Sequence, residues 1–157
     1  MFKNLIGYLI ALSTFNSFAF AADKIDYKAY GFSIDQLPSN TDFSGQALMM
    51  FSTAADGFAP NVNVMVQKYP GTIQDYIKLS KTQMTDAKMK MVSEPTIDKS
   101  AATLEYEGVM QGKSLHFFAK AISKNGKIYL ATATLPSDQW AKNSKSFKDN
   151  VNSLEVK

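Results

Sequence analysis

The chain has 157 residues, and its 17 basic and 14 acidic residues give a formal net charge of +3 at pH 7. It contains no cysteine, which excludes disulfides, thiolate metal sites and a thiol nucleophile. Every basic residue is lysine, and the lysines are interleaved with acids along the chain, a distribution typical of a solvated surface and not of a nucleic-acid-binding stripe. The single histidine, His116, cannot form the multi-histidine sites common in catalytic zinc centres. We therefore expect no metal, no cofactor, no catalytic residues and no nucleic-acid partner.

Residues 1–21 have the pattern of an export signal. Lys3 supplies the short positive region, and Leu5–Leu12 is an uncharged apolar stretch too short to span a bilayer comfortably. Ala19-Phe20-Ala21 is the small-x-small motif that signal peptidase accepts, so we predict cleavage after it in preference to a retained anchor. The mature chain, residues 22–157, is then a single domain in the periplasm or secreted further. No cysteine follows the cleavage point, so we expect no lipid and no stable membrane anchor.

The first half of the mature chain predicts strands followed by one helix. The loop 53–60 separates two of the strands, and the alternation of valine with asparagine near residue 62 is typical of a strand. After Pro70-Gly71, Thr72 can cap a helix with Asp75 in its first turn, and an apolar face continues to about residue 88. The predicted strands are Tyr30–Ile34, Gln46–Phe51 (a buried strand) and Asn61–Gln67.

The second half predicts an antiparallel run closed by a helix. Asn125-Gly126 is a strong signal for a tight hairpin turn. Ser137 is the predicted cap of the last helix, in which Trp140, Ser144, Phe147, Val151 and Leu154 share one face. The expected fold is α+β, an α/β/α sandwich with a largely antiparallel sheet. The strands predicted here are 90–96, then, after a turn at 97–100, 101–110, 114–123 and 127–135.

Several segments in this order resemble the PsbP/Mog1/DcrB-like family. They are Tyr30–Ile34 with Leu37-Pro38, Asn61–Val64, Thr72–Tyr76, Gly126–Thr134 and the closing Phe147–Leu154. The resemblance implies the sandwich fold and a role in binding another protein, because members of this family share a fold and not a reaction. The chain departs from the DcrB lipoprotein pattern in having no lipobox cysteine, which counts against a membrane-tethered role.

These observations predict a non-enzymatic accessory or chaperone-like protein that binds another envelope or secreted protein. Asn61 and Asn63 face the same way on one strand, so they form a candidate partner-binding stripe; alternatively, they end the sheet and satisfy loop backbone groups. The rival hypothesis is a small-molecule-binding protein or hydrolase. Its pocket would lie near His116 and draw on Glu105, Tyr129 and Asn63. The oligomeric state is left open by the sequence.

Overall fold

The computed structural model describes residues 24–28, 31–35, 43–54 and 56–157, which belong to two separate units. The first is an antiparallel hairpin of β1 (Lys24–Tyr27) and β2 (Phe32–Asp35). Tyr27 pairs with Phe32, and their rings stack with centroids 5.2 Å apart. The predicted strand at 30–34 corresponds to β2, although its first residue lies outside the described residues, as does the predicted signal at 1–21.

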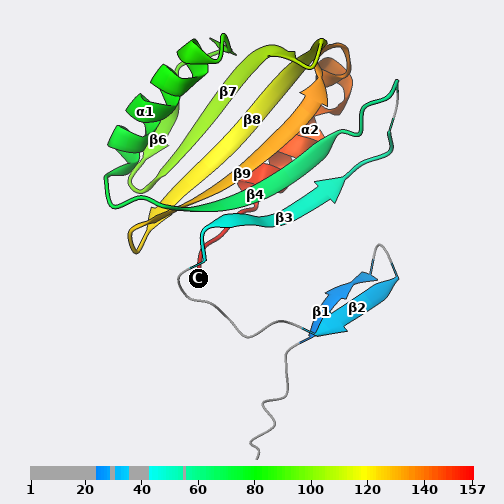
Figure 1. Ribbon diagram of the computed structural model, residues 1–157, viewed down its shortest axis with the longest axis horizontal. Coiled ribbons are helices and arrows are strands. Elements are labelled where there is room, and N and C mark those ends of the chain that lie inside the picture. The colour runs from blue at the N-terminus through cyan, green and yellow to red at the C-terminus, as the bar shows by residue number, and fades with distance from the viewer. Residues whose placement is uncertain (1–23, 29–30, 36–42, 55) are drawn as a thin grey trace, which may run out of the picture. The chain divides into compact units, whose positions relative to one another are not determined.

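The second unit is a seven-stranded sheet with one helix on each face (Figure 1). The strand order is β3-β4-β9-β8-β7-β5, with β6 also pairing with β7, and every pair is antiparallel. The predicted α+β sandwich with a largely antiparallel sheet is therefore confirmed. The elements are β3 (Gly45–Phe51), β4 (Asn61–Lys68), α1 (Ile73–Asp86), β5 (Lys90–Met91), β6 (Thr96–Asp98), β7 (Ala101–Met110), β8 (Lys113–Lys124), β9 (Lys127–Pro136) and α2 (Ser137–Asn152).

The centre of the sheet is the meander β7-β8-β9, joined by two-residue turns. Asn125 and Gly126 both have positive φ, 53° and 69°, as the type I′ turn predicted for this dipeptide requires. Side chains on β8 and β9 are buried on both faces, because α1 packs on one face and α2 on the other. The α1 face holds Ile73, Tyr76, Ile77, Ala102, Leu104, Ala119, Ala121 and Ile128, and the α2 face holds Val62, Phe118, Ala131, Ala133, Leu135 and Val151.

The two helices begin in different ways. Thr72 caps α1 as predicted: its hydroxyl accepts from the Asp75 amide, and the Asp75 carboxylate accepts from the Thr72 amide, which is a capping box. In α2 the predicted cap, Ser137, is instead the first helical residue, and the capping position belongs to Pro136. Its fixed φ of −56° suits entry into a helix, but it has no side-chain oxygen to cap the first amides.

The sequence-based prediction fails at both sheet edges. The strand predicted as buried at 46–51 is β3, an edge strand whose residues are exposed or half-buried. The strand predicted at 90–96 is two short pieces, β5 and β6, and β6 extends into the segment predicted as a turn at 97–100. Pro95, which has no N–H to donate to a ladder, lies in the break between these pieces.

Candidate binding site

A cluster of polar and aromatic side chains lies between α2 and the strands β7 and β8. His116 Nε2 lies 2.9 Å from Glu105 Oε1, and Lys148 Nζ on α2 donates to Glu105 Oε2 at 2.8 Å. The His116 ring stacks on Trp140 with centroids 3.8 Å apart and planes inclined by 17°. Lys148 Nζ also lies 5.2 Å from the ring centre of Phe118. These contacts join the helix to both strands.

The charge of Glu105 is stabilised within this cluster. Burial acts to raise the pKa of this carboxyl group, but the hydrogen bonds from Lys148 and His116 and the lysine charge outweigh it, so the pKa lies below its ordinary value. Glu105 is therefore an anion shared between two donors. A carboxylate bonded to a histidine can orient the imidazole for catalysis. The same carboxylate, bonded to Lys148 on α2, can instead hold the helix in place.

The placement of His116 favours the second role. His116 is 8% exposed, and its ring packs under Trp140. Three hollows in the described part of the chain border α2, and His116 lines none of them. A general base must be within hydrogen-bond reach of its substrate, directly or through one water molecule, and none of these pockets brings a substrate to this ring.

The four residues proposed for a pocket near His116 are not brought together. Glu105 and His116 share the face covered by α2, as that hypothesis required. Tyr129 is on the same face but near the opposite end of the strands, because it pairs with Ile122 whereas His116 pairs with Leu135. Asn63 pairs with Thr132 and lies on the other face of the sheet, so it cannot join the cluster.

Asn61 and Asn63 occupy one face of β4, as the sequence predicted, between strands β3 and β9. Both are half-buried. Asn61 Nδ2 donates to the carbonyl oxygen of Ala59 at 3.1 Å, so this side chain holds the preceding loop, as the alternative interpretation of the pair requires. A role of the pair in partner binding stays a prediction.

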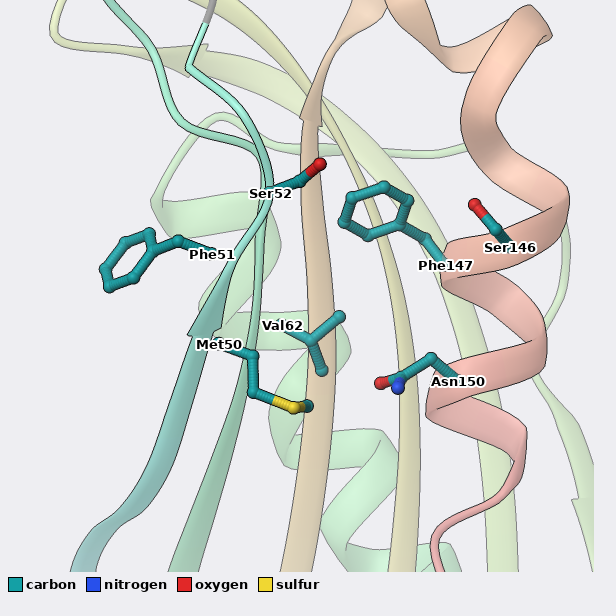
Figure 2. Close-up of a pocket in the computed structure, with 7 residues that line it drawn as sticks. All are labelled: Met50, Phe51, Ser52, Val62, Ser146, Phe147 and Asn150. Atoms are coloured by element: carbon teal, nitrogen blue, oxygen red, sulfur yellow. The ribbon is translucent and has the colours of Figure 1, made fainter. Parts of the chain in front are cut away.

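A groove of about 190 Å³ lies on the opposite side of α2 from the His116 cluster, between the helix and strands β3 and β4. Figure 2 shows Met50 and Val62 directed toward the helix and Phe147 and Asn150 directed back toward the strands, whereas Phe51 points away. The lining residues are all uncharged: Met50, Phe51, Ser52, Val62, Ser146, Phe147 and Asn150. The floor of the groove is continuous with the core under α2, which Met50 and Phe147 also contact.

Two larger hollows lie near the start of α2 and have charged linings. One, of about 290 Å³, includes Asp56 and Lys113, and the Lys113 ammonium group donates to the backbone oxygen of Asp56 at 2.8 Å. The other, of about 610 Å³, includes Lys90 and Glu107, whose charged groups are 3.7 Å apart. In both hollows a lysine is thus already paired within the chain, by a hydrogen bond in the first and by a long ion pair in the second. Among the described residues, no group of three or more histidine, aspartate or glutamate side chains could hold a metal ion.

Sequence reasoning missed the groove because its residues come from three separate segments. The available signal was the absence of charge: no residue from Phe43 to Ala54 is ionisable, although acids and lysines are frequent elsewhere. That signal predicts a neutral strand, but it does not say that α2 lies beside it.

The fold defines the chain structurally as PsbP-like, and the predicted resemblance is confirmed at this level. The cyanobacterial PsbP protein CyanoP from Synechocystis matches with a TM-score of 0.50 and 17% identity, over 90% of this chain and 96% of that one. A protein of unknown function from Pseudomonas aeruginosa, PA94, matches with a TM-score of 0.61 and 10% identity, over 87% of this chain and 97% of its own. At such identities the likeness concerns the fold, and it does not single out DcrB.

Sequence comparison adds no relative to these structural neighbours. No protein-family model matches the chain, and no curated protein matches it by sequence. A function therefore has to be argued from the chain's own residues.

Proposed function

We propose that the protein is a non-enzymatic, exported accessory or chaperone-like protein that binds another envelope or secreted protein. The observation that carries this proposal is the neutral, partly exposed apolar surface at β3. Phe43 is 41% exposed and Met49 is 38% exposed, and the groove beside α2 adjoins the strand. An apolar groove with partly exposed apolar side chains beside it is a feature of many protein contact sites, and methionine adapts to partners of varied shape.

The export part of the proposal depends on the pattern of residues 1–21, with cleavage after Ala21 and a periplasmic or secreted mature chain. In the described part of the chain, no helix is long and apolar enough to cross a membrane. The test is N-terminal sequencing of protein from the producing cell. The mature chain should begin at Ala22, and a cytosolic protein that retains Met1 would contradict export.

The binding part is tested by crosslinking in the periplasm followed by affinity capture of the chain and mass spectrometry. A specific partner from the envelope or the secreted proteins should be enriched over a control bait of similar size and charge. The bait must be folded for this test. Circular dichroism of the purified bait should therefore show a β-sheet spectrum. Failure to enrich any partner from cells that make the protein would contradict the proposal.

A further inference from the structure

The two edges of the seven-stranded sheet differ in how they resist further strand pairing. One edge consists of β5 and β6, of two and three residues, with Pro95 between them and Lys90, Glu94 and Asp98 alongside. Short strands, proline and charges are the devices that block pairing at sheet edges. That edge is protected.

The other edge, β3, has none of these three devices. Its seven residues include no charge and no proline, and the single irregularity is the register shift between Gln46 and Leu48. Among the described residues its one strand neighbour is β4. A long, apolar and uncharged edge is a ready template for an added strand.

The register shows which backbone groups face outward from this edge. Ser52 N–H donates to the Pro60 oxygen at 2.7 Å, so that pair is of the hydrogen-bonded type. Antiparallel pairs alternate in type, which makes Met50↔Val62 hydrogen-bonded and Met49↔Asn63 not. The N–H and C=O of Met49 therefore point away from β4, toward the position of an added strand.

The same register connects the edge with the groove. Met50 and Val62 are opposite one another and both line the groove beside α2. A residue of an added strand opposite Met50 would project to this same face, because side chains at paired positions share a face of the sheet. A cavity of roughly 150 Å³ can hold a benzene-sized molecule. The groove, at about 190 Å³, has room for one large apolar side chain.

We infer that β3 is the docking edge for an extended, uncharged segment of the partner protein, which adds to the sheet beside Met49 and places a large apolar side chain in the groove. This inference rests on the proposed function. Charge selects the occupant: neither β3 nor the groove lining has an ionisable residue. A charged side chain seated there would lose its water without gaining a counter-charge.

The test uses labelled synthetic peptides of alternating threonine and valine with one varied central residue, titrated against the folded mature chain. Peptides with leucine, methionine or phenylalanine at the centre should bind. Those with aspartate or lysine should bind at least about tenfold more weakly, because their charge is left unpaired. Amide hydrogen exchange at Met49 should slow when the leucine peptide is bound, since its outward N–H then has an acceptor.

Two variants test the edge and the groove separately. Met49→Pro removes the outward N–H while leaving the β4 ladder its donors, and should abolish binding. Asn150→Lys places a charge in the groove at an exposed helix position, and should weaken binding by about tenfold. Ala141→Lys is the matched control: it adds the same charge to an exposed position of the same helix outside the groove, and should bind like the native chain.

Several outcomes would overturn the inference. These are equal affinity for leucine- and aspartate-centred peptides, binding unchanged in both Met49→Pro and Asn150→Lys, or no binding by any peptide. A concentration-dependent dimer that is lost in Met49→Pro, with no peptide bound, would make a second copy the occupant instead.

The periplasmic capture experiment separates this inference from the proposed function. Capture of the same partner by native and Met49→Pro baits would refute docking at β3 and leave the accessory function standing. Capture by neither bait would refute the function itself.

Discussion

Helix α2 meets the sheet differently on its two sides. Toward β7 and β8 the contact is polar, and side chains occupy the space between helix and strands. Glu105 bonds with His116 and Lys148, and Trp140 covers the imidazole. Lys120 on β8 adds hydrogen bonds to the carbonyl oxygens of Asn152 and Leu154 at the end of the helix. Toward β3 and β4 the contact is neutral and leaves the groove of Figure 2.

The difference shows which side can accept a ligand. On the polar side, a ligand would have to replace hydrogen bonds between partly buried groups, and leaving any of them unmade costs free energy. On the neutral side, a ligand displaces water from apolar surface, which is favourable. The polar side therefore holds the helix, and the neutral side is where we propose that a partner binds.

The largest effect is expected from removing the shared anion. Glu105→Ala leaves His116 and Lys148 without their acceptor, and should lower the free energy of unfolding by about 2 kcal/mol. Urea denaturation followed by circular dichroism measures this.

Glu107→Ala is the matched control, because Glu107 shares the strand face but its side chain is 42% exposed and its pair with Lys90 is long, at 3.7 Å. That variant should lose less than about 0.5 kcal/mol. Equal losses would show that the Glu105 cluster does not hold the helix.

A smaller loss is expected at His116. His116→Gln keeps a side-chain donor that can reach toward Glu105 but removes the stacking on Trp140, and should cost about 1 kcal/mol. Partner capture by this variant should equal that of the native chain. If the variant folds but loses its cellular function, the rival hypothesis of a ligand pocket or hydrolytic site near His116 would gain support.

The polar side should also make stability depend on pH. Because the folded-state pKa of Glu105 lies below its ordinary value of 4.5, the unfolded chain takes up the proton first as the pH falls. The stabilisation from Glu105 is thus complete above about pH 4.5 and is lost as the pH falls through the folded-state pKa. Urea unfolding of native and Glu105→Gln chains across this range should show their difference shrinking with acid. A constant difference would contradict the lowered pKa.

The smallest effect is expected on the neutral side. Asn150→Lys and Ala141→Lys should both change the free energy of unfolding by less than about 0.5 kcal/mol, because both positions are exposed. Thermal unfolding of the two variants and the native chain measures this. A large loss in Asn150→Lys alone would show that the groove is part of what holds the helix, and would remove the contrast between the two sides.

Local features of the fold could be predicted from the sequence, because each depends on a few neighbouring residues. The Asn125-Gly126 turn needs only positive φ at two positions, and the capping box needs only Thr72 and Asp75 one turn apart. The spacing of Trp140, Phe147 and Val151 likewise identified the buried face of α2. The sequence of strands and helices along the chain then indicated the sandwich class of fold, but not the order of the strands in the sheet.

What the tertiary structure alone decided concerns neighbours that are distant in the chain. An apolar run such as β3 has the same composition at an edge as at the centre of a sheet, so its exposure follows only from the strand order. Asn63 and His116 were grouped in one hypothesis because strand periodicity assigns faces within a strand, whereas register is needed to relate faces between strands. The groove joins β3 and β4 to helix residues that follow at least 84 positions later (from Val62 to Ser146), and it exists only because packing places α2 beside that edge.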